Sequence, residues 1–349
     1  ERKVGMGIAG QPSGATDVAD VFSTDLFNSG NNITPITINN GIDLAGKGGM
    51  VWFASRGSAK LPNITDTERG AGYRLAPSST ASSTSTSNYE VVTSFNSNGF
   101  VYSDGYANNT AASWTFRKKE KFFDVVTWTG NDVAGRTIPH GLDGSVGMII
   151  AKCTTHNRDW VIWHKDLVDN KYLVLNSNAA QANSTTVWRT TDPTTTVFSV
   201  GDNARTNAGG SSYVAYVFAD NQSLDAEEQM IKCGSFTSSS ANQVINLGWE
   251  PQFVLVKSSS NAMSWYIFDT MRGIVTGGND SILAPNDALV EETASQYIDL
   301  TATGFISHFN ALAGSRDYIY MAIRAPMMVE PKAATDVFAV DAAGSGALP

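Results

Sequence analysis

The sequence predicts an all-β protein made of three tandem antiparallel β-sandwich domains of the jelly-roll or lectin-like kind. Two observations predict it. Short apolar runs, such as residues 148–152, 253–257 and 318–323, are separated by clusters of Gly, Asn and Ser, which is the pattern of many short strands joined by turns. Three segments of the chain also share one order of sequence features, with a period of about 100 residues. A unit of that length suits an antiparallel sandwich.

The individual runs are expected to be strands rather than helices. Apolar residues alternate with polar ones at a period of two, which places one face of each strand on a core and the other against solvent or a neighbour. Long Glu-, Lys- and Leu-rich stretches with a helical period are missing from the sequence.

The repeat is clearest between the second and third segments and looser in the first. The matching stretches are 123–130, 137–142 and 147–152 in the second, 234–237, 244–248 and 251–257 in the third, and 26–30, 36–38 and 49–54 in the first. Each segment closes on an alternating strand, at 113–116, 213–218 and 318–323. So many ordered matches indicate three diverged copies of one unit.

These matches set the expected boundaries of the domains. We expect repeats at residues 21–120, 121–228 and 229–329, with an N-terminal connector at 1–20 and a C-terminal linker at 330–349. Ala15–Val18 resembles Ala334–Val337, so one kind of connector is expected to enter the first repeat and to leave the third. The chain begins at Glu1 rather than Met, and a longer polypeptide with a further module is expected.

The run from Ser78 to Asn88 is almost entirely Ser, Thr and Asn and has too little apolar character to pack. We expect it to be a mobile insertion at the edge of the first sandwich, a plain surface loop rather than a binding loop.

Charge and hydropathy argue against two classes of partner. The net charge of −9 disfavours nucleic acid, which would require a basic surface to replace phosphate counterions. The basic cluster at 117–121 follows an expected strand and is interpreted as a solvated strand end. The sequence contains no run of about 18 apolar residues, so no membrane span is predicted.

No catalytic residue, metal site or cofactor is predicted. The four histidines, His140, His156, His164 and His308, include no pair at metal-ligand spacing, and His140 is expected to serve a turn. Nucleophile-elbow, phosphate-loop and dinucleotide motifs are missing. Cys153 and Cys233 each accompany an expected strand and are predicted to be buried free thiols.

The motif Asp-Thr-x-Arg-Gly occurs in matching places in the first and third repeats. Its residues are Asp66, Arg69 and Gly70 in the first copy and Asp269, Arg272 and Gly273 in the third. A ligand or Ca²⁺ site, with Asp as an oxygen donor, is one interpretation. The favoured one is a structural turn, in which Asp accepts from nearby amides, Arg bridges oxygens and Gly takes positive φ.

Aromatic residues offer the weak candidates for a ligand site. Most of the eight tryptophans fall on strands at equivalent positions, which indicates core layers. Trp188 and Trp249 fall closer to loops and are the better candidates for an exposed surface on which a sugar could stack.

The segment 129–142, together with 147–152, resembles a repeat found in tail-fibre and other virion proteins of marine and related bacteriophages. The resemblance runs from about Phe22 to Phe338 and includes 159–165, 196–201, 213–218, 269–273 and 321–327. It implies a place in the virion and supplies no catalytic residues. The first repeat differs most from the phage repeat, both at residues 52–56 and in its long Ser/Thr insertion.

The sequence therefore leads us to expect a non-enzymatic phage structural protein, a fibre or appendage subunit on tail or head. We expect a homotrimer that contacts other virion proteins and contributes to attachment to host-surface glycans. One alternative is a tailspike depolymerase, although the repeat is far too long for the rungs of a β-helix. Another is a cellular carbohydrate-binding module that acts as a monomer.

Overall fold

The computed structural model describes residues 17–28, 35–86, 90–103, 109–189, 191–225, 228–309 and 315–326. Within these ranges the only helices are a 3₁₀ turn, η1 (Val18–Asp20), and one turn of α-helix, α1 (Leu44–Lys47); the other regular elements are strands. The predicted all-β fold is confirmed. The predicted linker at 330–349, residues 1–16 of the predicted connector, and most of the similarity between them lie outside the described residues.

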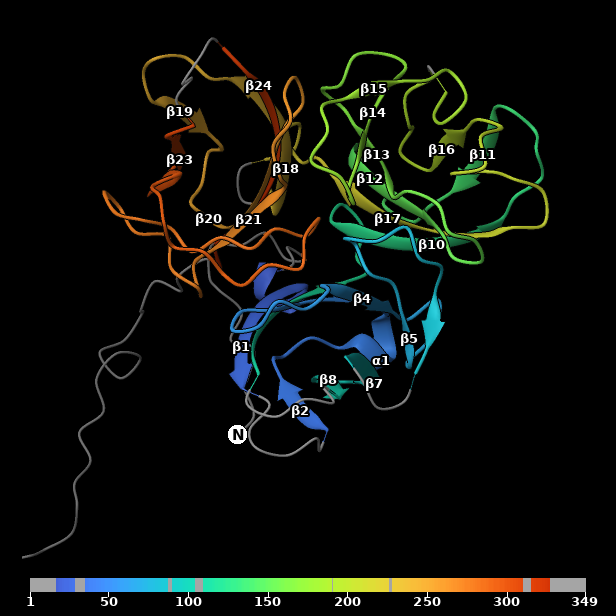
Figure 1. The fold of residues 1–349 in the computed structure, drawn as a ribbon, viewed down its shortest axis with the longest axis horizontal. Coiled ribbons are helices and arrows are strands. Elements are labelled where there is room, and N and C mark those ends of the chain that lie inside the picture. Colours follow the sequence, from blue (N-terminus) through green and yellow to red (C-terminus); the bar gives the residue numbers. More distant parts are fainter. Residues whose placement is uncertain are drawn as a thin grey trace, which may run out of the picture.

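The strands form three lobes around a common centre (Figure 1). The first lobe contains an inner sheet in the order β1 (Phe22–Asn28), β9 (Thr110–Arg117), β3 (Gly49–Ser55) and β4 (Asn63–Asp66). Its outer sheet has the order β2 (Ile36–Asn39), β8 (Gly99–Ser103) and β7 (Val91–Asn96), and β5 (Tyr73–Arg74) pairs with β6 (Thr84–Ser85).

The second and third lobes follow the same plan. In the second lobe the inner sheet has the order β10 (Phe123–Thr129), β17 (Ser212–Ala219), β12 (Val146–Cys153), β13 (Val161–His164), β14 (Lys171–Val174) and β15 (Ala182–Asn183), and β11 (Arg136–Pro139) pairs with β16 (Val197–Val200) outside it. In the third lobe the inner order is β18 (Ile231–Thr237), β24 (Asp317–Arg324), β20 (Pro251–Ser258) and β21 (Tyr266–Asp269), and the outer order is β19 (Gln243–Asn246), β23 (Gly304–Ser307) and β22 (Ile298–Thr301).

The antiparallel register gives each residue a counterpart in the other lobes. Phe116, Phe218 and Ile323 each lie opposite the first strand of their own sheet, facing Phe22, Phe123 and Ile231. On the other side they face Met50, Met148 and Phe253. Residues related in this way are called equivalent below.

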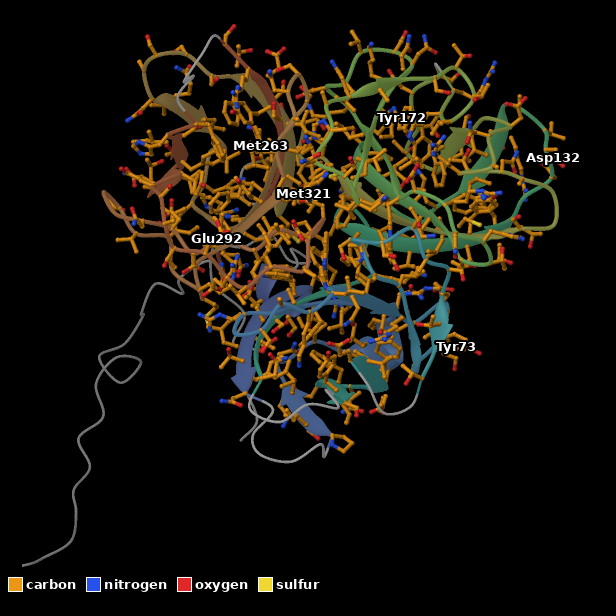
Figure 2. All side chains as sticks on the ribbon, viewed as in Figure 1. Tyr73, Asp132, Tyr172, Met263, Glu292 and Met321 are labelled. Carbon is orange, nitrogen blue, oxygen red and sulfur yellow. The ribbon has the colours of Figure 1, made fainter. Side chains whose placement is uncertain are left out.

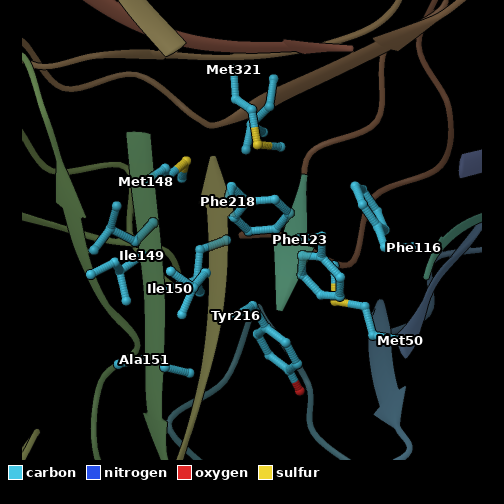
Figure 3. Packing of buried hydrophobic residues seen from close by; sticks show 14 of the residues in the cluster. Met50, Phe116, Phe123, Met148, Ile149, Ile150, Ala151, Tyr216, Phe218 and Met321 are labelled. Carbon is cyan, nitrogen blue, oxygen red and sulfur yellow. The ribbon is translucent and has the colours of Figure 1, made fainter. Parts of the chain in front are cut away.

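The inner sheets share one hydrophobic core at the centre of the molecule. Met50 and Phe116 of the first lobe, Phe123 and Phe218 of the second and Met321 of the third point into it (Figure 3). The ring of Phe116 packs edge-on against Phe218, with centroids 5.6 Å apart, and against Phe253 of the third lobe at 6.1 Å. Side chains fill the space around Met321, whereas Asp132 lies at the far edge of the second lobe (Figure 2). The lobes are therefore joined by packing and not by linkers alone.

The other face of each inner sheet packs on its outer sheet, which makes each lobe a sandwich. In the first lobe this smaller core contains Phe53, Phe100 and Tyr102, and in the third it contains Phe268 and Phe305. Alternate side chains of an inner strand therefore enter two different cores, and both sets are buried. This explains why strands such as β12 and β20 are apolar on both faces.

Candidate functional site: the contacts between the three lobes

The Asp-Thr-x-Arg-Gly motif forms a buried turn where β4 ends. Asp66 Oδ1 accepts from the backbone N–H of Arg69 at 2.9 Å, and Arg69 Nε donates to Asp66 Oδ2 at 2.6 Å. Arg69 Nη2 also donates to the carbonyl oxygen of Ile64, at 3.0 Å. Gly70 follows with φ of 93°, a conformation that glycine adopts without strain.

The third lobe repeats this turn after β21. Arg272 Nε donates to Asp269 Oδ2 at 2.5 Å, its backbone N–H donates to Oδ1 at 2.9 Å, and Nη2 donates to the carbonyl oxygen of Ile267 at 2.6 Å. Gly273 has φ of 101°. Arg272 and Asp269 are both buried, so their opposite charges satisfy each other away from water.

Each of these turns also binds the neighbouring lobe. Tyr216 of the second lobe donates its hydroxyl to Asp66 Oδ2 at 2.7 Å, and Trp114 of the first lobe donates Nε1 to Asp269 Oδ2 at 3.0 Å. Tyr216 and Trp114 are equivalent residues of β17 and β9. The guanidinium of Arg272 lies over the Trp114 ring, 5.4 Å from its centroid. Burial raises the pKa of Tyr216 well above its ordinary value, which keeps the phenol a donor.

In the second lobe, His164 occupies the position of the two aspartates. Its Nε2 lies 3.1 Å from the carbonyl oxygen of Tyr320 in the third lobe, and its Nδ1 accepts from the backbone N–H of Asp166 at 3.2 Å. Burial lowers the pKa of His164 to about 4. A neutral ring protonated at Nε2 satisfies both contacts, so this histidine acts as a fixed hydrogen-bonding group and not as a proton carrier.

Backbone hydrogen bonds close the three lobes into a ring. The N–H of Ser83 donates to the carbonyl oxygen of Thr154 at 2.8 Å, that of Gln181 to Ser259 at 2.8 Å, and that of Glu291 to Arg56 at 3.0 Å. The three acceptors are equivalent residues, each one position beyond the end of β12, β20 or β3. The first lobe therefore binds the second, the second binds the third, and the third binds the first.

A buried lysine lies at two of these contacts. Lys152 donates Nζ to the carbonyl oxygens of Cys153 at 2.7 Å and Thr80 at 3.2 Å. Its equivalent Lys257 donates to Ser258 at 2.7 Å and Asn178 at 3.3 Å. Burial lowers the pKa of both lysines to about 8.

At the third contact, between the third and first lobes, the residue equivalent to the lysines is Ala54, and Arg56, two positions further along the chain, supplies a half-buried cation. Its guanidinium forms an ion pair with Glu291 at 2.8 Å. Here the cation is paired with a carboxylate instead of being held by carbonyl oxygens alone.

The Ser/Thr run of the first lobe differs from its expectation. Residues 78–86, which the structure describes, supply Ser83 N–H and Thr80 oxygen to the second lobe, and the Thr80 oxygen also accepts from the backbone N–H of Arg158 at 2.9 Å. The run is thus held against the second lobe instead of being a free insertion. Low apolar content misled the prediction because the run is bound through its backbone.

The two tryptophans predicted to be exposed are buried, and that prediction was wrong. Trp188 is 4% exposed and packs edge-on against Phe198, and Trp249 is 3% exposed and donates Nε1 to Gln229 Oε1 at 3.2 Å. Neither indole offers a face to a ligand. Loop-like sequence around them does not reveal that Trp188 packs into the central core and Trp249 into the smaller core of the third lobe.

The remaining predictions about single residues concern His140 and the cysteines. His140 is buried and its Nδ1 accepts from the backbone N–H of Leu142 at 3.3 Å, while burial lowers its pKa. Cys153 and Cys233 are buried free thiols, as predicted. Burial raises the pKa of Cys233 well above the ordinary thiol value, so it stays protonated and unreactive.

Two searches cover the described part of the chain. Among these residues no group of three or more His, Cys, Asp or Glu side chains is placed to hold a metal ion. No helix in the described ranges is both long and apolar enough to cross a membrane.

The roles of Tyr216 and Trp114 were not anticipated from the sequence. Aligning the repeats places them at one position with Met321, and a position that mixes Tyr, Trp and Met on a core strand signals different partners in each copy.

No curated protein and no solved structure matches this chain. One family model covers residues 17–326, which takes in all three lobes as one unit. The chain therefore belongs to the family described as a domain of unknown function, DUF7483.

Proposed function

We propose that this chain is a non-enzymatic structural protein of a bacteriophage virion, a subunit of a fibre or appendage on the tail or the head. The observation that carries the proposal is that buried polar side chains form hydrogen bonds between the lobes. Asp66, Asp269 and His164 are each bound to a group of another lobe, so they hold the body rigid. Groups engaged in this way are not available as acid, base or nucleophile.

The resemblance to phage fibre repeats supports the virion part of the proposal. It extends over both the second and third lobes, including β12, β17 and β24. The adhesive part of the proposal is a contribution to host attachment through surface glycans. The net charge of −9 with abundant Ser, Thr and Asn suits polar contacts of that kind and not binding to nucleic acid.

Assembly as a homotrimer belongs to the same proposal. Appendages gain avidity when several weak contacts act together. Light scattering coupled to size-exclusion chromatography of the full chain measures its mass in solution, and we expect three copies. A monomer would instead favour the alternative of a carbohydrate-binding module.

The virion location is tested on purified phage particles whose genome encodes this sequence. We expect an antibody raised against the full chain to label intact particles in immunogold microscopy, and cryo-electron microscopy to place its three-lobed density on the tail or the head. Particles that lack the protein by mass spectrometry would refute the proposal.

The enzymatic alternative has its own test. The full chain is incubated with polysaccharide from the host, and new reducing ends are measured over time. We expect no release of reducing ends above that of a heat-denatured control, because the buried carboxylates of Asp66 and Asp269 are bound at the contacts between the lobes. Rapid release of oligosaccharides would establish a depolymerase instead.

A further inference from the structure

An open pocket of about 290 Å³ lies in the second lobe beside the end of β13. Its lining includes the half-buried Trp163, Lys165, and the loop that contributes Asp192, Thr194 and Thr195. A partly exposed aromatic residue beside several hydrogen-bonding residues is unlike the contacts between the lobes, where Trp114 and Tyr216 are fully buried.

The pocket exists because the second lobe has a smaller cover over Trp163. In the described residues its outer sheet consists of β11 and β16 alone, whereas the outer sheets of the other lobes have three strands. The equivalent residue in the third lobe, Phe268, is fully buried beneath Tyr297 and Phe309, with ring centroids 5.9 and 6.3 Å away. The described part of the second lobe has no strand corresponding to β22, and no aromatic ring is found packed on Trp163 there, which leaves this residue half-buried.

The first lobe does not offer a second pocket of this kind. Its equivalent residue is Thr65, which is 1% exposed and lies on the strand that faces the three-stranded outer sheet. Because neither Thr65 nor Phe268 presents an accessible aromatic face, the feature belongs to the second lobe. Among the three equivalent positions, all of which lie in the described residues, only Trp163 places a partly exposed aromatic side chain here.

The rim of the pocket is fixed before any ligand arrives. Thr194 donates its N–H to the carbonyl oxygen of Val197 at 2.8 Å, and its hydroxyl oxygen accepts from the N–H of Val197 at 3.0 Å. The N–H of His140 in the turn after β11 donates to the carbonyl oxygen of Thr196 at 2.8 Å. A preformed rim lowers the entropic cost of binding.

We infer that this pocket binds one neutral pyranose residue of a surface polysaccharide. The axial C–H groups of a pyranose pack on an indole face, and its equatorial hydroxyls match donors and acceptors such as Lys165, Asp192 and Thr195. The volume lies just below the range of about 300–1,000 Å³ for ligand pockets, which fits a single sugar ring.

Charge makes the neutral sugar the better match. The Lys165 ammonium already lies 3.2 Å from Asp220 and 3.5 Å from Asp166, so its charge is compensated within the protein. Asp192 adds a further carboxylate to the lining. An acidic sugar would bring its own carboxylate toward this excess of negative charge and would lose affinity.

This inference deepens the adhesive part of the proposed function and rests on it. The test uses the purified full chain and a panel of methyl glycosides of glucose, mannose, galactose and N-acetylglucosamine, with methyl glucuronide as the acidic counterpart. Saturation-transfer NMR and tryptophan fluorescence report binding. We expect at least one neutral glycoside to bind with a Kd of roughly millimolar order, and the glucuronide to bind more weakly.

Variants assign the binding to the pocket. Trp163→Ala should weaken binding about tenfold or more because the stacking face is lost, and Trp163→Phe should retain most of it. Asp192→Asn should reduce the difference in affinity between neutral and acidic sugars, because it removes one negative charge from the lining. Tyr73→Ala is the matched control, since Tyr73 is 44% exposed and lies in the first lobe (Figure 2), whereas the residues of the pocket belong to the second lobe. Circular dichroism and thermal midpoints verify that each variant is folded.

The outcomes separate this inference from the proposed function. No binding to any neutral member of the panel, unchanged binding by folded Trp163→Ala, or preferential binding of the glucuronide would each overturn the pocket assignment. If virions carry the chain and it still binds host cells in those cases, the proposed function stands while the site is wrong. If the pocket binds sugar as expected but virions lack the chain, the proposed function fails alone.

Discussion

Asp269 accepts hydrogen bonds from the Arg272 backbone, from the Arg272 guanidinium and from Trp114 of another lobe. Its carboxylate is fully buried, so each of these donors replaces a water molecule that the unfolded chain would have had. The same logic applies to Asp66 with Arg69 and Tyr216. Single residues at the joints therefore serve two purposes, since they shape a turn and also bind the next lobe.

The buried lysines give the stability of the protein a specific pH dependence. Lys152 and Lys257 have folded pKa values of about 8, lowered by burial from the ordinary 10.5. Between these values the unfolded chain binds protons that the folded chain does not, so unfolding free energy rises with pH from about 8 upward. Above the ordinary tyrosine pKa of 10.0 it should fall again, because burial raises the pKa of Tyr266 and Tyr320 in the folded chain. We expect a maximum near pH 10, measured as urea midpoints from pH 7 to 11.

A double variant isolates the lysine contribution. Lys152→Met with Lys257→Met should flatten the rise above pH 8, because the buried side chains no longer titrate. Lys47→Met, at the exposed end of α1, is the control and should keep the wild-type slope. Equal slopes in the double variant and the wild type would mean that other groups cause the pH dependence.

At the scale of elements, the outer hairpins depend on glycines that the second lobe lacks. Gly304 begins β23 with φ of 156°, and a Cβ there would lie 2.0 Å from the carbonyl oxygen of Ile245. The equivalent Gly99 begins β8 with φ of 120° and the same distance to Ile38. In the second lobe the equivalent residue is Val197, where β16 starts without a preceding hairpin strand. Glycine at this position therefore accompanies the third outer strand.

Gly304→Ala should consequently destabilise the third lobe. The methyl group adds a steric clash to backbone strain of about 1–3 kcal/mol, so we expect a loss at the upper end of that range or beyond, measured by urea unfolding. Gly210→Ala is the control, because Gly210 also has positive φ, at 74°, but nothing lies within 4 Å of its Cβ position. A similar loss in both variants would show that the contact with Ile245 contributes nothing.

The elements themselves could be predicted from the sequence because their cause is local. The alternation of apolar and polar residues predicted the strands. The Asp-Thr-x-Arg-Gly motif predicted hydrogen bonds between residues that are close in the sequence, as seen between Asp66 and Arg69. Exposure of the aromatic side chains could not be predicted in this way. Trp163 is half-buried beside a pocket and Trp188 is buried against Phe198, and the alternation of apolar and polar residues around the two tryptophans does not distinguish these outcomes.

At the scale of the whole molecule, each lobe depends on the others for burial. Phe123, Tyr216 and Phe218 of the second lobe lie in the shared core and are at most 1% exposed. A lobe removed from the ring would present this aromatic face to water as one large apolar patch. Sequence comparison predicts three similar units but not this mutual dependence, because similar units could equally well be joined only by linkers.

We therefore expect the second lobe, expressed alone as residues 121–228, to fail as an independent domain. It should bind the dye ANS, elute as aggregates and lack a cooperative thermal transition, because its core face has no cover. When residues 1–120 are co-expressed with residues 121–349, the first lobe and the third lobe can both cover the core face of the second lobe. We expect this pair of polypeptides to form a soluble complex. A monomeric isolated lobe with a sharp melting transition would contradict the prediction.

The three joints all run in the same direction, from a donor loop of one lobe to the strand end of the next, and the bond from Glu291 to Arg56 joins the last lobe back to the first. Such a head-to-tail interface is self-limiting only while it closes on itself. If that final joint opens, its two halves fit a second molecule as well as they fit each other. Reclosure between molecules would produce domain-swapped dimers or open polymers, whereas intramolecular closure satisfies all three contacts within one chain.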